Sequence, residues 1–417
     1  MQSIVVCLIL LLLFLTFLKL RKTRKLRMNL AKLTVEELEQ HSERATITHD
    51  VTFKKNLLNW PLPRVNDNYN FIKSLYKDLN DDIRQKRAVP PAAEWVLDNY
   101  YILEEQTKSL RKNLTKKDYY NLPLLKEGPY KGYTRVFAIA MEFSTIMDSQ
   151  IDETTLHRYL ESYQQQNVLF DREIRMVPIM LQIALIENVR TICEDIKETQ
   201  KQWQSADVII EKWWNVQTLD AENVIALFMS AIEKSVADNH AFIEHLFYRL
   251  RRAGVSYTHI LRAINAHLSK FYTTTEAIAQ VEHNRQAVSA VSMGNAIVSF
   301  KYIASLNWVH LFESLSYVER ILQNDPFGVY NLMSAQTRSY YVMQVERLAK
   351  KHWVSERLIA KAAIDLAIAA AQTQKQTQEL KSDYSNAYLR RAHVGFYLIG
   401  EGVGTLEKSQ IKKEKLF

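Results

Sequence analysis

Apolar residues recur every three to four positions along most of this chain, and this spacing predicts helices. It is clear in Tyr69–Arg87 and again in Val136–Met147. The stretch Met176–Cys193 is apolar on nearly every side, which is typical of a central helix in a bundle. No stretch alternates convincingly as a strand would, and no internal repeat of fixed period is present. The pattern therefore predicts helices packed on helices.

Turn residues divide these helices. The densest turn signal is Asn121–Tyr133, with two Pro and two Gly. The segment "NWPLPRVNDN" (Asn59–Asn68) is expected to be a linker, and "VPP" (Val89–Pro91) should break the chain and restart a helix, since Pro is tolerated in a first turn. Three polar residues are expected to cap helix N-termini: Asp152, Asp220 and Ser355.

The stretch His283–Trp308 is polar at its start and apolar through its middle. Its apolar residues predict one buried helical stripe made of Val288, Val291, Ile297, Ile303 and Leu306. Gly294 lies in the middle of this helix and removes a side chain, at a cost of about 1 kcal/mol relative to Ala. We expect it to permit a close helix crossing or a bend.

Composition strengthens the helical interpretation. The chain has only 9 Gly and 8 Pro among 417 residues, and Ile179–Asp325 contains no Pro and only two Gly. Sheets and tight turns need both residue types, so long helices are favoured. The expected fold class is all-α: one or more multi-helix bundles preceded by one N-terminal transmembrane helix.

The transmembrane helix is predicted from "MQSIVVCLILLLLFLTFL", residues 1–18, which carries no charge. At about 1.5 Å per residue it reaches about 27 Å, close to the thickness of a bilayer core. A signal peptide would place basic residues before the apolar run and end in a small-residue cleavage site, and neither is present. A core helix remains the alternative. Basic residues follow the run, so the bulk of the chain is expected in the cytoplasm, on a single-pass anchor in a bacterial inner membrane.

The formal net charge of +8 gathers at the two ends of the chain. The middle is close to neutral, so no nucleic-acid groove is indicated. The two Cys, Cys7 and Cys193, form no disulfide framework, which fits a reducing compartment. The expected divisions are an anchor (1–18), a basic juxtamembrane segment and linker (19–63), two helical bundles (64–250 and 251–402) and a basic tail (403–417).

Candidate chemistry is sparse. His240 and Glu244 are four residues apart, but His245 follows at the wrong spacing for a zincin, so a polar helix face is expected instead of zinc. Nothing indicates that Glu94, Glu104 and Glu105 converge as paired acids. The aromatic residues, Trp213 and Trp214 among them, could stack on sugar rings, although core packing is the commoner use.

Phosphate-binding motifs are also missing from the sequence. There is no GxxxxGK[ST], no GxGxxG and no D-x-D. "QVERL" (Gln344–Leu348) differs from a QxxRW glycosyltransferase signature because Leu348 stands in place of Trp. No catalytic, metal or cofactor-binding residue is therefore assigned, and no cofactor is expected.

Four collinear stretches resemble the region that precedes the glycosyltransferase domain in bacterial cyclic β-1,2-glucan synthases. They are Val89–Gln106, Ile174–Arg190, His283–Tyr341 and Arg390–Gly402. The chain departs from the family pattern in Met333–Ser339, "MSAQTRS", where the family has "MDFATRD" and both acidic residues are lost.

The resemblance implies a link to cyclic glucan synthesis from a nucleotide sugar, with the catalytic residues on a separate glycosyltransferase domain or subunit. The expected function is then non-catalytic: a membrane-anchored helical region that tethers and positions the catalytic domains. Two alternatives remain. One is a helical-toroid glycoside hydrolase or phosphorylase-like enzyme acting on β-glucan, and the other is an unrelated membrane scaffold.

Overall fold

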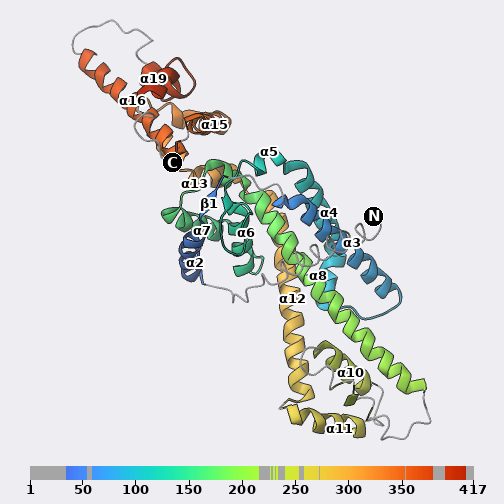
Figure 1. The fold of residues 1–417 in the computed structure, drawn as a ribbon. Coiled ribbons are helices and arrows are strands. Elements are labelled where there is room, and N and C mark those ends of the chain that lie inside the picture. The colour runs from blue at the N-terminus through green and yellow to red at the C-terminus, as the bar shows by residue number, and fades with distance from the viewer. Residues whose placement is uncertain are drawn as a thin grey trace, which may run out of the picture.

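The computed structural model describes residues 34–53, 59–215, 240–252, 258–271, 273–352, 354–378 and 390–409, with isolated positions between 226 and 232. These residues are mostly helical, which confirms the predicted all-α class. The anchor predicted over residues 1–18 and the cap predicted at Asp220 lie outside the described residues. Most of the buried hydrophobic side chains of the described residues form three clusters, which follow one another along the elongated molecule in Figure 1.

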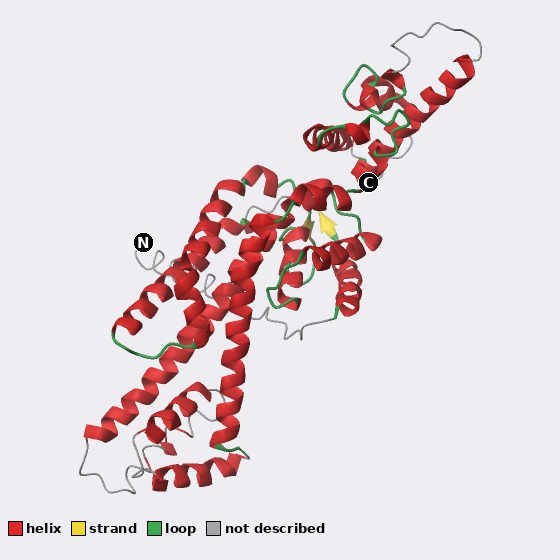
Figure 2. Ribbon diagram, turned by 180° about the vertical axis from the view of Figure 1, so that it is seen from behind, coloured by secondary structure: helices red, strands yellow, loops and turns green. Residues whose placement is uncertain are grey.

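The central cluster is the largest. It is built from the first part of α8 (Asp171–Asn215), the second half of α12 (Thr275–Ser305), and the following elements: α2 (Val35–Thr48), α3 (Pro61–Arg84), α4 (Pro91–Asn113), α5 (Lys116–Tyr119), α6 (Arg135–Ile146), α7 (Glu153–Gln166) and α13 (Trp308–Leu315). Two short strands, β1 (Val51–Thr52) and β2 (Leu124–Leu125), pair antiparallel at its edge (Figure 2).

The distal cluster lies where α8 and α12 diverge, and it is closed by α10 (His240–Arg252) and α11 (Thr258–Leu268), which a short 3-10 helix, η3 (Ser269–Phe271), follows. The C-terminal cluster lies at the opposite end of the molecule (Figure 1). Its elements are α14 (Tyr317–Leu322), η4 (Tyr330–Leu332), α15 (Ala335–His352), α16 (Glu356–Gln378), α18 (Gly395–Leu398) and α19 (Val403–Ser409). The division into bundles at 64–250 and 251–402 stays a prediction.

Several local predictions are confirmed. Asp152 caps α7 by accepting a hydrogen bond from the Thr155 N–H at 2.8 Å, and Ser355 Oγ accepts one from the Leu358 N–H at 3.2 Å. The helix expected after Val89–Pro91 begins with Pro91 as its first residue. The predicted linker Asn59–Asn68 is wrong, because α3 begins at Pro61. A first-turn Pro needs no hydrogen-bond partner for its nitrogen, so the Pro residues here start a helix.

Gly294 permits a close helix crossing, as predicted. A Cβ atom at this position would lie 3.0 Å from Cζ2 of Trp95, so α12 and α4 approach more closely than a side chain would allow. The predicted buried stripe is only half right. Ile297 and Ile303 are buried and Leu306 is half-buried, but Val288 and Val291 are 63% and 59% exposed, because the helices that pack on α12 leave one of its sides uncovered.

Polar side chains of α12 form hydrogen bonds with the turn between α6 and α7. Asp148 and Ser149 in this turn both have left-handed backbone angles, with φ of 47° and 63°. Ser292 donates a hydrogen bond to the Asp148 carboxylate at 2.5 Å, and Ser299 donates one to the Ser149 carbonyl oxygen at 2.7 Å. Non-Gly residues persist in this conformation only where their surroundings fix it, and α12 supplies those contacts.

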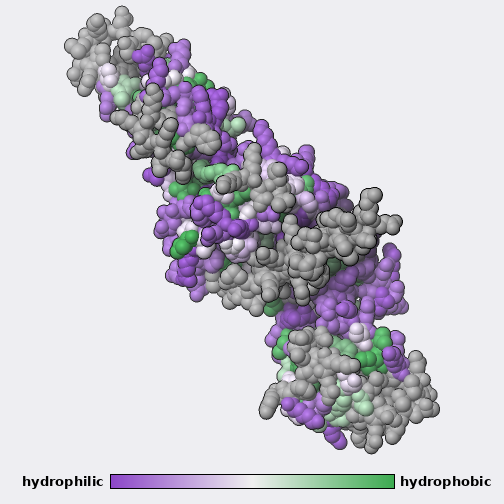
Figure 3. Space-filling view, viewed as in Figure 1, coloured by the Kyte–Doolittle hydropathy of each residue, from purple (hydrophilic) through white to green (hydrophobic). Residues whose placement is uncertain are grey.

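Two described helices are long and apolar enough to cross a membrane by length and composition. They are the segments Asp171–Lys212 of α8 and Thr275–Ser305 of α12. Both contribute side chains to the central cluster, and the apolar window of α8 is 67% buried within the protein. Core helices pass the same test, so their composition alone places neither in a bilayer. Figure 3 shows hydrophilic side chains over much of the described surface.

Candidate functional site

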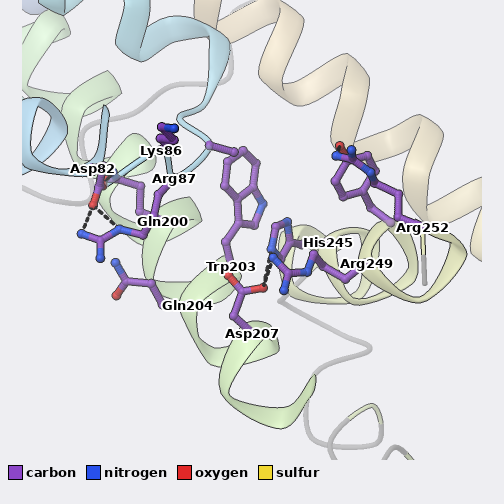
Figure 4. Close-up of a pocket in the computed structure, with 12 residues that line it drawn as sticks. Asp82, Lys86, Arg87, Gln200, Trp203, Gln204, Asp207, His245, Arg249 and Arg252 are labelled. Carbon is purple, nitrogen blue, oxygen red and sulfur yellow. Dashed lines mark hydrogen bonds and ion pairs between the residues drawn. The ribbon is translucent and has the colours of Figure 1, made fainter. Parts of the chain in front are cut away.

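A pocket of about 410 Å³ lies between the end of α3, the second half of α8 and α10 (Figure 4). Charged, amide and aromatic side chains line it: Asp82, Lys86, Arg87, Gln200, Trp203, Gln204, Asp207, His245, Tyr248, Arg249 and Arg252, together with Ala88. Its volume falls within the range of about 300–1,000 Å³ that small-molecule sites occupy.

The first wall is built by the way α3 ends. The Lys86 N–H donates to the Ile83 carbonyl and the Arg87 N–H donates to the Asp82 carbonyl, both at 2.9 Å. This pair of bonds defines a Schellman motif, in which the residue after the cap adopts a left-handed conformation and is usually Gly. Here that residue is Lys86, with φ of 56°. Arg87 Nε also donates to the Asp82 carboxylate at 2.8 Å, in place of the usual hydrophobic contact, and Gln200 donates to the same carboxylate.

The second wall is a ladder of stacked rings from α8 and α10. The Trp203 and His245 rings lie 5.1 Å apart with an interplanar angle of 15°, and Tyr248 continues the stack at 6.2 Å from His245. His245 Nε2 lies 3.1 Å from Asp207 Oδ1, and Arg252 donates to the Tyr248 hydroxyl at 2.7 Å. The facing sides of α8 and α10 thus both contribute aromatic and polar side chains to the pocket.

The pocket is basic. It has four Lys and Arg side chains against two Asp. Arg87 pairs with Asp82, and Arg249 lies 3.3 Å from Asp207, so both carboxylates already have cationic partners. Neither Lys86 nor Arg252 has a carboxylate partner within the described part of the chain. The Trp203 Nε1–H is buried and has no hydrogen-bond partner there either.

A second group of ionisable residues joins the central and C-terminal clusters where α8 and α16 begin. The Ser316 hydroxyl donates to Asp171 Oδ1 at 2.7 Å, and the Asp171 N–H donates to Glu356 Oε2 at 3.2 Å. Burial raises the pKa of Asp171 to about 6. Burial, together with the neighbouring Asp171, raises the pKa of Glu356 to about 7. Raised carboxyl pKa values can mark general acids. Neither carboxyl lines either of the two cavities described here, and their contacts make a joint between the starts of α8 and α16.

The second cavity, of about 450 Å³, lies beside this joint and is mostly apolar. Trp308 and Phe312 line it, together with Ser339, one of the positions where the chain departs from the family pattern. Glu313 and Glu319 also line it, and Arg338 contacts both: it donates to Glu313 at 2.6 Å and lies 3.0 Å from Glu319. The charged groups here pair with one another across helices.

The residues considered from sequence fall in different places. His240 and Glu244, expected on a polar helix face, are half-buried, and Glu244 lies 3.4 Å from His283 on α12. His245, expected to point elsewhere, is buried and lines the first pocket. Glu104 accepts a hydrogen bond from Tyr69 at 3.2 Å, whereas Glu94 and Glu105 are exposed. Within "QVERL", Leu348 is buried in the C-terminal cluster. The side chains of Trp213 and Trp214 lie outside the described part.

Fold and site together define a helix-packed protein whose described residues form a basic, aromatic pocket. No protein-family model matches the chain. It is 26% identical over 346 residues to the cyclic beta-(1,2)-glucan synthase NdvB of Rhizobium meliloti (strain 1021). The matched region covers 83% of this chain but only 12% of that relative, so the chain spans a small part of the synthase's length.

Proposed function

We propose that this chain is a non-catalytic, membrane-anchored helical component of a cyclic β-1,2-glucan synthase-like system. The observation that carries the proposal is the extent of the similarity: it runs through 83% of this chain and is confined to 12% of a much longer synthase. Most of this chain therefore corresponds to one small region of the synthase. Such a region is expected to assist the activity of the much larger rest of that enzyme.

The packing of the chain supports a positioning role. Buried charges are paired internally, as in the contact of Arg135 with Glu173, both almost fully buried. Helix α8 contributes to the central and distal clusters and forms the joint to the C-terminal one, so a single helix links the three. Such a body can hold a catalytic domain at a fixed place. The apolar run at residues 1–18 would hold the body at the inner face of the bacterial membrane, where a tether raises the effective concentration of the partner.

The experiment is a deletion in the bacterium that encodes the chain, with cyclic glucan measured in cell extracts. We expect glucan to fall on deletion and to be restored by the full chain. A chain lacking residues 1–18 should restore it only in part, because the tether is lost. Unchanged glucan after deletion would contradict the proposal.

A parallel assay addresses the enzymatic alternative. The purified full chain is incubated with β-1,2-glucan, and released sugar is measured. Sugar release that a single carboxylate substitution abolishes would favour a glycoside hydrolase or phosphorylase-like enzyme. Co-purification with signalling proteins alone, and with no glycosyltransferase, would favour an unrelated scaffold.

A further inference from the structure

We propose that the pocket between α3, α8 and α10 binds a sugar phosphate. This inference goes beyond the positioning role: the pocket's own side chains carry it, and the proposed function only guides the choice of glucose as the test sugar. Figure 4 shows the Trp203 indole between the Lys86–Arg87 side of the pocket and the side formed by Arg249 and Arg252. A ligand entering here meets cations from both sides and an aromatic ring between them.

The phosphate is assigned to Lys86, and Arg252 on the other side of the Trp203 indole adds a longer-range attraction for the anion. Their positive charges are the ones that no described carboxylate compensates, whereas Arg87 and Arg249 are neutralised by Asp82 and Asp207. Bonds from a cationic donor to a phosphate oxygen are about twice as strong as bonds between neutral groups. A dianionic phosphate at Lys86 would therefore supply the negative charge that the described residues do not, and Arg252 would attract the same anion from across the pocket.

The geometry of Lys86 is a second argument. Its left-handed conformation is unfavourable for an L-residue, and Gly is the residue that usually fills this position of the motif. A Lys at a position that suits Gly better points to use of its side chain. The same feature provides a clean test, because Lys86→Gly removes the cation while favouring the observed backbone.

The ring of the ligand is assigned to Trp203 and the polar groups beside it. The buried Nε1–H has no partner in the described structure, and a buried unsatisfied donor is unfavourable until a ligand oxygen accepts from it. Gln204 adds an amide and Asp207 a carboxylate to the same lining, and these groups pair with ring hydroxyls. An aromatic face with hydroxyl-binding groups around it suits a sugar.

The test is a calorimetric titration of the full chain in a detergent whose head group contains neither sugar nor phosphate. The ligands are glucose 1-phosphate, glucose and inorganic phosphate. We expect saturable binding of glucose 1-phosphate with a Kd below about 1 mM, and weaker binding of the other two.

Variants then separate the two halves of the site. Lys86→Gly should raise the Kd about tenfold with no loss of thermal stability, and Arg252→Gln should raise the Kd by less. Trp203→Phe keeps a ring but removes the N–H, and it should weaken glucose 1-phosphate more than inorganic phosphate. Lys112→Gln, an exposed substitution at the end of α4, is the matched control and should bind as wild type.

Three results would overturn the proposal. They are no saturable binding of glucose 1-phosphate below about 10 mM, unchanged binding in both cation variants, or inorganic phosphate binding as tightly as the sugar phosphate. Vesicles containing an anionic phospholipid test the other source of a phosphate ester. Binding to them through Lys86 and Arg252, with none to the soluble ligand, would also overturn it.

Discussion

The contact between Gly294 and Trp95 allows a direct test of how closely α12 and α4 pack. A Cβ atom added at Gly294 would lie 3.0 Å from Cζ2 and 3.2 Å from Cε2 of the indole, closer than ordinary van der Waals contact. Two effects then compete in Gly294→Ala. The helix gains about 1 kcal/mol from the better helix former, and overpacking costs about 1–3 kcal/mol. Trp95 is 39% exposed and can tilt partly outward, so we expect a net destabilisation of about 1 kcal/mol.

The sign should reverse when the indole is removed. In a Trp95→Ala background the steric term disappears, and Gly294→Ala should stabilise the protein by about 1 kcal/mol. The coupling energy between the two positions is then about 2 kcal/mol, within the range measured for residues in contact. The assay is thermal unfolding of the four proteins in detergent, followed by far-ultraviolet circular dichroism. One kcal/mol should move the Tm by a few degrees at most in a chain of this size.

Gly404 in α19 provides the control, because a Cβ atom there would meet nothing within 4 Å. Gly404→Ala should therefore show the helix-propensity gain alone, in either background. If Gly294→Ala stabilised the protein equally with and without Trp95, the two residues would not be in contact. The close crossing of α4 and α12 would then be wrong.

Three further predictions concern buried polar groups and a second tight Gly. Glu356 has its pKa raised to about 7, so its contribution to stability is greatest below the ordinary carboxyl pKa and is lost as the pH rises towards 7. Glu356→Gln keeps a hydrogen-bond acceptor for the Asp171 N–H but carries no charge. The Tm of this variant should therefore exceed that of the wild type at pH 8, with a smaller difference at pH 5. A difference in Tm that does not change with pH would count against the raised pKa. Arg135→Met should destabilise the protein by about 3–5 kcal/mol in denaturant titrations, because it leaves the Glu173 carboxylate buried and unpaired, and adding Glu173→Gln should recover part of the loss. Gly395→Ala should lower the Tm, because the new Cβ atom would overlap the Tyr341 hydroxyl oxygen; an unchanged Tm would mean that the Tyr341 side chain or the start of α18 can shift.

The helical class could be predicted from sequence because it depends on short-range physics. Few Gly and Pro leave few tight turns, and a capping side chain such as Asp152 acts within its own first turn. The exposed Val288 and Val291 could not be predicted in the same way. Helical spacing identifies apolar residues that share a face, but only the arrangement of neighbouring helices determines whether that face is covered.

The pocket was missed for a related reason. Trp203 and Asp207 lie four residues apart on α8, and His245 and Arg249 lie four apart on α10, so each pair shares a helix face that sequence alone reveals. Only the tertiary structure brings these faces together beside Lys86. The sequence does contain one local signal of the pocket, which is a Lys, instead of the usual Gly, just after the C-terminus of α3. This signal can be recognised only when the positive φ of Lys86 is known.

Helix α8 connects the parts of the molecule that carry the proposed functions. Asp171 at its start belongs to the joint with the C-terminal cluster, and Trp203 lies in the pocket 32 residues further on. At about 1.5 Å per residue the two sites are about 50 Å apart along one helix. The middle of α8 is fixed by the central cluster, so a ligand in the pocket is held at a set distance from the joint. Because close-packed interiors have low compressibility, this arrangement favours rigid positioning of the two sites.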